Sequence, residues 1–236
     1  MFRWLRDRRR RALAAQPTPP AWSGWLEHRV PFFERLSPEG RARFLELLRI
    51  FVGEHRFVGA GGLTVTEEMK VVVGACAVRL ILHLDLSLYD GVTEIVIYPQ
   101  RTLVDPKDGT RFLGQAHHHG AVILCWPAVL DGLKRAHDGH DTALHEFAHA
   151  LDLADGSFDG APPLRAAEDY GPWAQVLGKH FERLQRQHSP VLRDYGATNP
   201  AEFFAVASEA FFEKGDALRR TSPDLYAALA RFYRGA

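Results

Sequence analysis

Apolar side chains recur every three or four residues over several segments of the chain, which is the spacing of one buried helix face. Residues that favour helix starts, such as Ser, Thr, Asn, Asp and Pro, stand before most of these segments. The pattern predicts helices that begin near Pro38, Glu67, Ala128, Thr142, Trp173, Pro200 and Pro223.

Two short segments are instead rich in β-branched and other apolar residues. Residues 93–98 and 121–126 are bounded by glycine and proline, which predicts two buried strands. Together the elements predict an α+β fold, mostly helical, with a small mixed β-sheet ahead of the helix that begins near Thr142. We expect residues 21–236 to form a single domain, because no linker interrupts them. Residues 1–20 predict a flexible basic tail followed by a stiff proline-rich linker.

Composition argues against several classes of function. The 236 residues contain 29 Lys and Arg and 29 Asp and Glu, and zero net charge argues against nucleic acid as a direct partner. The apolar run 71–84 is interrupted by Arg79 and His83, so no transmembrane segment is expected. Cys76 and Cys125 lie in apolar runs and predict small buried residues in a reducing, cytoplasmic protein. The basic N-terminus lacks the apolar region of a secretory signal.

One pentapeptide, HEFAH at residues 145–149, matches the HExxH motif of zinc peptidases and indicates a metal site. Its two histidines stand one helical turn apart on the same face, where both can bind one tetrahedral zinc ion. Glu146 can hold a metal-activated water and take its proton. Asp141 precedes the motif as a helix N-cap. The alternative is a core helix without metal, but burying two imidazoles and a carboxylate is costly when nothing satisfies them.

A third protein ligand has to come from elsewhere in the chain. Asp155 lies six residues after the second histidine, where one class of zinc peptidase has its third ligand, but Asp152 replaces the glycine at which such chains turn. A later helix is the better source, since Glu202, Glu209 and Glu213 share one face there among four phenylalanines. Glu202 is preferred to Glu209 and lies in the first turn, where the positive helix end suits a ligating carboxylate. The alternative role of Glu202 is that of a capping-box residue.

Four segments together resemble the Mlc titration factor A family of zinc-dependent peptidases. They are residues 94–99 (EIVIYP), 120–126 (GAVILCW), 145–152 (HEFAHALD) and 195–209 (YGATNPAEFFAV, then SE after one residue). The segments occur in the family's order and cover most of the chain from about residue 30 onward. The family's catalytic core looks related to the anthrax lethal factor metalloprotease domain, so the resemblance implies a zincin-like fold.

The resemblance also implies roles for individual residues. It identifies His145, His149 and Glu202 as ligands of one Zn²⁺ per chain, and Glu146 as the catalytic base. Tyr195 corresponds to a tyrosine that faces the metal in such enzymes, and its phenol would donate to the oxyanion of the tetrahedral intermediate. The alternative for Tyr195 is a loop aromatic that covers the core.

Three further features have both a functional and a structural interpretation. Asp152 is placed for a hydrogen bond to a ligand imidazole, or is a residue of the last helical turn. His117-His118-His119 departs from the family pattern and can reach the site, bind a second metal or inhibit it, although a solvated turn is the simpler interpretation. The arginine-rich N-terminus can dock onto an acidic partner or a membrane surface, or is a solvated leader.

We therefore expect a cytoplasmic zinc metallopeptidase that hydrolyses peptide bonds with a metal-activated water. The resemblance suggests aminopeptidase-like action on short peptides. It also implies the main alternative, a regulatory binding protein that sequesters a sugar-responsive transcriptional repressor, with catalysis secondary or absent. A purely structural zinc site is the third hypothesis, and the intact Glu146 argues against it.

Overall fold

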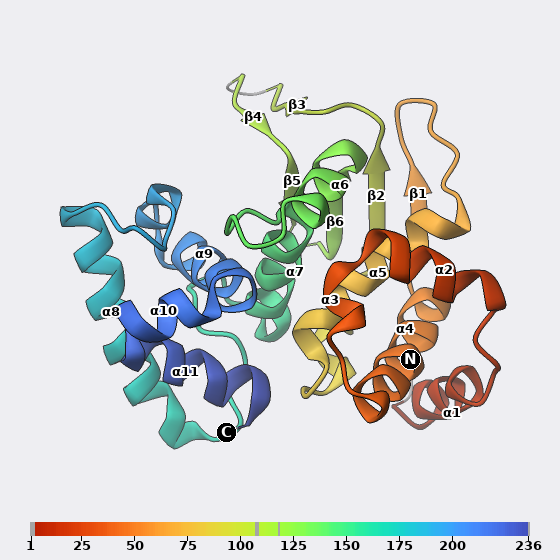
Figure 1. Ribbon diagram of the computed structural model, residues 1–236, viewed down its shortest axis with the longest axis horizontal. Coiled ribbons are helices and arrows are strands. Elements are labelled where there is room, and N and C mark those ends of the chain that lie inside the picture. Colours follow the sequence, from red (N-terminus) through yellow and green to blue (C-terminus); the bar gives the residue numbers. More distant parts are fainter. Residues whose placement is uncertain (1–2, 107–108, 118, 236) are drawn as a thin grey trace.

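The computed structural model describes residues 3–106, 109–117 and 119–235. Most of them are helical, and a small mixed sheet precedes the HExxH helix, so the predicted α+β class is confirmed. In Figure 1 the N-terminal helices (red to yellow) lie on the right and the C-terminal helices (teal to blue) on the left, with α7 between them.

The α-helices of the described residues are α1 (Arg3–Ala14), α2 (Pro20–Arg29), α3 (Pro31–Glu34), α4 (Pro38–Glu54), α5 (Glu67–Ile81), α6 (Trp126–Lys134), α7 (Thr142–Asp152), α8 (Tyr170–Arg186), α9 (Pro200–Glu213), α10 (Gly215–Thr221) and α11 (Pro223–Arg234). The strands are β1 (Arg56–Gly59), β2 (Glu94–Tyr98), β3 (Leu103–Val104), β4 (Arg111–Phe112), β5 (Gly114–Ala116) and β6 (Ala121–Cys125). Short 3-10 helices include η1 (Leu86–Tyr89), η2 (Leu153–Asp155), η3 (Ala167–Asp169) and η4 (Asp194–Ala197).

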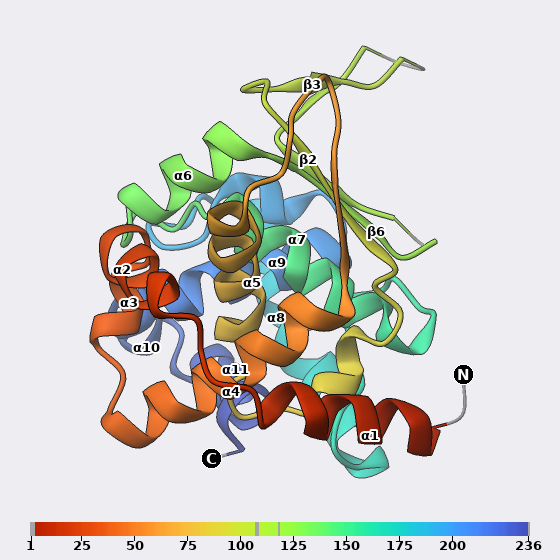
Figure 2. The same ribbon diagram turned by 90° about the vertical axis from the view of Figure 1, so that its right-hand side faces the viewer.

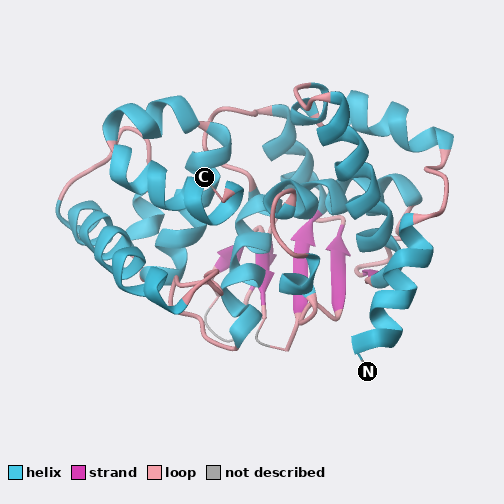
Figure 3. Ribbon diagram, turned by 90° about the horizontal axis from the view of Figure 1, so that it is seen from below, coloured by secondary structure: helices cyan, strands magenta, loops and turns pink. Residues whose placement is uncertain are grey.

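The main sheet has the strand order β1-β2-β6-β5, in which the first three strands are parallel and β5 pairs antiparallel with β6. Figure 3 shows these strands side by side, with most of the helices gathered to one side of them. Ile95 and Ile97 of β2 are fully buried, as expected for a strand in the core. The strands predicted at 93–98 and 121–126 are confirmed as β2 and β6. β1 and β5 escaped prediction because each is too short for a clear alternation.

Four of the predicted helix starts are confirmed by side-chain caps, whereas α6 and α8 begin two and three residues earlier than predicted and carry no such cap. Ser37 and Thr66 accept hydrogen bonds from the backbone N–H three residues on, at 3.1 and 3.2 Å. Asp141 caps α7 by accepting from the backbone of Leu144 at 3.0 Å. Asn199 caps α9 in the same way, at 2.9 Å. The two helices that carry the candidate site therefore begin where local chemistry requires.

Residues 3–14, expected as part of a flexible tail, form the helix α1, which packs on α4. Arg10 donates to Glu54 at 2.8 Å and to Asp90 at 2.7 Å. These acidic partners lie far along the chain, so the arginine run alone gave no sign of them. The proline-rich linker is also shorter than expected, because Pro20 is already the first residue of α2.

Helix α7 packs against α5, α9 and the strands β5 and β6, and all of its residues are buried. Figure 2 shows α5 and α7 alongside β2 and β6. The fully buried ring of Phe147 meets Phe51 and Tyr89 edge to face, with centroids 5.8 and 5.7 Å apart. This packing fixes the rotation of α7 about its axis, and with it the direction of its histidines.

Two expectations from composition are also tested by the structure. Cys76 and Cys125 are buried free thiols, as predicted. In the part of the chain that the structure describes, no helix combines the length and apolar character needed to cross a membrane.

Candidate metal centre

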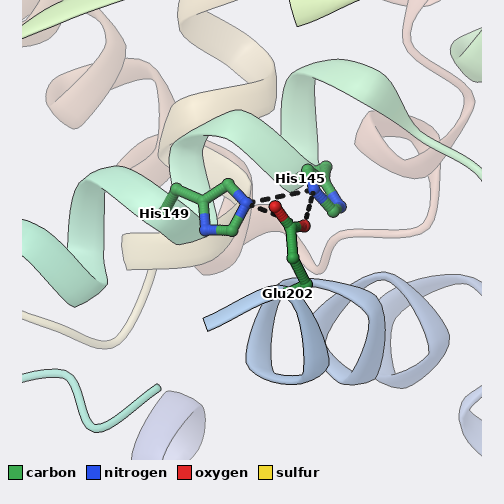
Figure 4. Close-up of side chains that lie close together, drawn as sticks. All are labelled: His145, His149 and Glu202. Carbon is green, nitrogen blue, oxygen red and sulfur yellow. Dashed lines mark hydrogen bonds and ion pairs between the residues drawn. The ribbon is translucent and has the colours of Figure 1, made fainter. Parts of the chain in front are cut away.

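The three residues expected to bind metal come together between two helices that are distant in sequence. His145 and His149 project from α7, and Glu202 faces them from the first turn of α9 (Figure 4). The Nε2 atoms of the two histidines lie 3.1 Å apart, and Oε2 of Glu202 lies 3.0 Å from the first and 3.2 Å from the second. In a tetrahedral zinc site with bonds of about 2.0–2.1 Å, ligand atoms lie about 3.3 Å apart. These three donor atoms form a triangle, called the donor triangle below, that is close to the size that one zinc ion requires.

The electrostatics of the donor triangle also suit a cation. Burial lowers the pKa of His145, but hydrogen bonds to Glu202 and Glu209 outweigh burial and raise it to about 10. Burial raises the pKa of Glu202, but the hydrogen bonds to His145 and His149 outweigh burial and hold it well below its usual range. Two imidazoles and a carboxylate held together by hydrogen bonds are the donor set of many catalytic zinc sites. A metal ion would replace the protons of these hydrogen bonds, so the residues fit zinc.

Glu209 holds the other side of His145. Its carboxylate is fully buried, and Oε1 accepts a hydrogen bond from His145 Nδ1 at 2.7 Å. The same carboxylate pairs with Arg193 and accepts the backbone N–H of Asp141 at 2.8 Å. With Nδ1 engaged, Nε2 of His145 is the nitrogen directed at Glu202. Of the three glutamates on this helix face, the third, Glu213, forms an ion pair with Arg79 instead.

Asp155, the other candidate for a third ligand, lies apart from the donor triangle. It falls in η2, is exposed, and accepts a hydrogen bond from the backbone of Ser157 at 2.9 Å. Among the described residues, the group able to hold one metal ion consists of His145, His149 and Glu202. The segment directly after α7 therefore does not supply the third donor.

Glu146 lies beside the edge strand of the sheet. Its side chain is 6 % exposed, and it contacts Gly114 and accepts a hydrogen bond from the backbone of Ala116 in β5. A Cβ at position 114 would lie 2.6 Å from Cγ of Glu146, so only glycine leaves room for the carboxylate. Burial raises the pKa of Glu146 to about 7, although the nearby His145 lowers it.

Tyr195 reaches the donor triangle from η4. Its phenol donates a hydrogen bond to Oε1 of Glu202 at 3.2 Å, and its ring centroid lies 6.0 Å from that of His145. The side chain is 51 % exposed, which does not fit the alternative of an aromatic that covers the core. Partial burial and the Glu202 carboxylate raise the pKa of Tyr195 to about 12, so the phenol keeps its proton.

The hydrogen bond expected between Asp152 and a ligand imidazole is not formed. Oδ2 of Asp152 accepts from the backbone of Gly160 at 3.0 Å and so holds the loop that follows α7. Oδ1 of Asp152 and Nδ1 of His149 are both buried without a hydrogen-bond partner among the described residues. Asp152 thus serves as a residue of the last helical turn.

Backbone hydrogen bonds join His117 to Gly120 and Ala121, directly ahead of β6. The backbone N–H of His117 donates to Ala121 at 2.9 Å, and Gly120 donates back to His117 at 2.8 Å. Neither His117 nor His119 belongs to the group that can hold a metal ion, and His118 lies outside the described residues. The simpler interpretation, a turn, agrees with this geometry.

A cavity of about 320 Å³ borders the donor triangle at His145. Its lining also includes Phe112 and Gly114 from the segment of β4 and β5, Glu146 from α7, and Tyr195. One ligand of the donor triangle, the carboxylate and the phenol therefore line the same cleft.

Sequence reasoning missed two residues of this region. A buried glutamate among phenylalanines requires a cationic or hydrogen-bonding partner, but nothing in the pattern singled out Arg193 for Glu209. An isolated glycine in a short strand indicates a close approach of other atoms, which was the available signal for Gly114.

Comparison with known proteins assigns the chain to a family. A family model described as glucose-regulated metallo-peptidase M90 matches residues 3–234. The chain belongs to this family. Membership assigns it to the metallopeptidases and confirms the resemblance noted in the sequence.

The relatives match over nearly their whole length. The uncharacterized protein slr2042 of Synechocystis sp. is 35% identical over 98% of this chain and 89% of its own. The protein named Mlc titration factor A of Edwardsiella ictaluri is 29% identical over 87% of this chain and 84% of its own. Its namesake in Yersinia pestis is 27% identical, with 99% and 90% covered.

Proposed function

We propose that the protein is a zinc-dependent peptidase that binds one Zn²⁺ per chain through His145, His149 and Glu202. The observation that carries the proposal is that three donor atoms lie within 4.8 Å of one another, beside a cleft that His145 and Glu146 line. A purely structural zinc site needs neither an open cleft nor a carboxylate beside the metal.

Zinc, when bound, supplies a Lewis acid that polarises the scissile carbonyl and makes water more acidic. Glu146 accepts the proton of the attacking water and delivers it to the leaving amine, so that water and a peptide bond become a carboxylate and an amine. A carboxyl with a pKa of about 7 is suited to take up and release a proton near neutral pH. Tyr195 donates a hydrogen bond to the oxyanion that develops on the carbonyl oxygen.

The test compares zinc-loaded protein with Glu146→Gln and Glu202→Ala on a panel of fluorogenic aminoacyl and short-peptide substrates. Elemental analysis should find one zinc in the wild type and in Glu146→Gln, and little in Glu202→Ala. Glu146→Gln should lose about 10²–10⁴-fold in turnover, the usual contribution of a general base. Wild-type turnover in Glu146→Gln would contradict the mechanism.

The substrate class proposed is short peptides with a free N-terminus, in keeping with the family resemblance. The same panel tests it when each peptide is supplied with a free and an acetylated N-terminus. We expect the acetylated peptides to be poor substrates. Equal cleavage of both forms would indicate an endopeptidase.

A second candidate function is the binding of a transcriptional repressor in the cytoplasm. The name Mlc titration factor A, carried by several relatives, supports this candidate. A pull-down of a sugar-responsive repressor with wild type and Glu146→Gln separates the two functions. Equal capture by both proteins, without turnover by the wild type, would favour the binding role.

A further inference from the structure

A second and larger cavity, of about 860 Å³, opens between the N-terminal and C-terminal helices. Its walls come from α3, α4 and α5 on one side and from α9, α10 and α11 on the other. The lining residues identified for it are all different from those of the cavity at the metal centre. Its volume is typical of small-ligand sites, which occupy roughly 300–1,000 Å³. The peptidase mechanism proposed above makes no use of it.

The inner wall of this cavity is aromatic. Phe32, Phe44, Phe211 and Tyr233 line it, and each is at most 7 % exposed. The guanidinium of Arg234 lies over the ring of Phe211, 4.9 Å from its centroid. An occupant would therefore meet apolar ring faces inside and cationic groups nearby.

The charges around the cavity are strongly unequal. Its cationic residues are Arg35, Arg79, Lys214, Arg220 and Arg234. Its carboxylates are Glu213 and Asp216, and both are already engaged, by Arg79 and by Arg219 respectively.

Four of those five cations have no carboxylate within 4 Å among the described residues, and Arg79 is the exception. The chain as a whole contains equal numbers of acidic and basic residues, so this local excess of positive charge is not a property of the composition. Arg35 contacts His137 and Arg234 donates to the hydroxyl of Tyr226, so these partners leave the positive charge uncompensated. Cations without a carboxylate partner beside an apolar wall attract a ligand that carries both negative charge and apolar surface.

We propose that this cavity binds a small organic anion whose apolar or aromatic body lies against the phenylalanine wall and whose anionic group meets Lys214, Arg220 and the neighbouring arginines. The site is independent of the proposed peptidase function, because it contains none of the residues assigned to that mechanism.

The cavity also borders the loop that leads into the metal helix. His137 lines it with φ of 87°, a left-handed conformation that side chains rarely adopt. The imidazole Nδ1 of His137 lies 3.1 Å from the backbone oxygen of Glu213, and its backbone N–H donates to the Glu213 carboxylate. Asp141, the N-cap of α7, follows four residues later. An occupant would therefore lie against the segment that positions the start of α7.

The test uses two fluorescent probes of similar aromatic body and different charge, 1-anilinonaphthalene-8-sulfonate and uncharged N-phenyl-1-naphthylamine. Each is titrated into zinc-loaded wild type, into Lys214→Glu/Arg220→Glu, and into Arg8→Glu/Arg11→Glu. The last variant makes the same change in net charge on α1, at two exposed arginines away from the cavity. Thermal unfolding confirms that each variant is folded.

We expect the sulfonate to bind the wild type and the α1 variant alike, and the cavity variant at least about 10-fold more weakly, because two attractive contacts become repulsive. Affinity for the uncharged probe should change less than about 2-fold. A second variant, Ala217→Trp, fills the cavity and should weaken both probes. Equal sulfonate affinity in the cavity and α1 variants, or no sulfonate binding to the wild type, would overturn the proposal. So would sulfonate binding that appears only after zinc is removed, since the probe would then occupy the metal centre.

Discussion

Replacing Gly114 with alanine tests the position of Glu146 without touching its chemistry. The new Cβ would lie 2.6 Å from Cγ and 2.9 Å from Oε1 of Glu146, where ordinary contacts begin at 3.4 Å. The Glu146 side chain or the strand β5 must therefore shift by about 0.8 Å or more. Both shifts change the distance between the carboxylate and a substrate held in the cleft.

A misplacement of about 1 Å at a reacting group costs about 10²-fold in rate, so kcat/KM of Gly114→Ala should fall about 100-fold, equivalent to about 2.7 kcal/mol. Zinc content should remain one per chain, because the three atoms nearest to the new Cβ all belong to Glu146. Overpacking of this size also costs about 1–3 kcal/mol of stability, which leaves a folded protein to assay.

Gly178→Ala is the matched control. This glycine lies within α8, and a Cβ there meets nothing within 4 Å. The control should keep wild-type kcat/KM and gain about 0.5–1 kcal/mol in stability, since alanine is the better helix former. Wild-type kcat/KM in a folded, zinc-loaded Gly114→Ala would refute the assignment of Glu146 as the base. Loss of zinc from this variant would refute the claim that the substitution displaces Glu146 alone.

Three further changes have definite expected outcomes. Glu209→Gln should lower zinc affinity about 10–100-fold at unchanged stoichiometry, because it weakens the hydrogen bond that orients His145. Competition with a chromophoric chelator measures this affinity, and Glu182→Gln, at an exposed glutamate, is the control. Burial lowers the pKa of His55, so its contribution to stability, complete above about pH 6.5, is lost as pH falls through the folded-state pKa. His55→Gln should therefore flatten the acid side of the urea-unfolding profile, and an unchanged slope would contradict this. Phe147→Ala should destabilise the protein by about 3–5 kcal/mol in urea unfolding, and a loss below about 1 kcal/mol would contradict its role as a core anchor.

Elements with a local signal could be predicted from the sequence. Asp141 and Asn199 mark the starts of α7 and α9 because a capping side chain acts on a backbone N–H only three residues away. Helix α1 has no such signal, and its place depends on Glu54 and Asp90, which lie outside the segment. A run of arginines is read as solvated unless its distant partners are known.

The candidate site also contains one part that local sequence predicts and one part that depends on distant contacts. His145 and His149 are neighbours on one helix, so their pairing follows from spacing alone. The choice of Glu202 over Glu209 does not, because the two carboxylates are chemically equal and share one face of α9. Which of them meets Nε2 and which meets Nδ1 depends on how α9 lies against α7. Before the structure, the preference for Glu202 rested on its place in the first helical turn and on the family resemblance.

Glu202 and Glu209 contact different nitrogens of His145, and these two roles explain why so much charge is buried at the interface of α7 and α9. A buried ion pair is a weak source of stability, and apolar residues of similar size would hold two helices together at least as well. An apolar side chain at 209, however, would leave Nδ1 of His145 without an acceptor and the imidazole free to rotate. Glu209, itself paired with Arg193, holds the imidazole of His145 through Nδ1. Glu202, seven residues earlier on the same helix, meets the Nε2 atom of that imidazole. The two glutamates together determine where a metal ion can bind. The buried charges are thus better explained by the geometry of the site than by the stability of the fold.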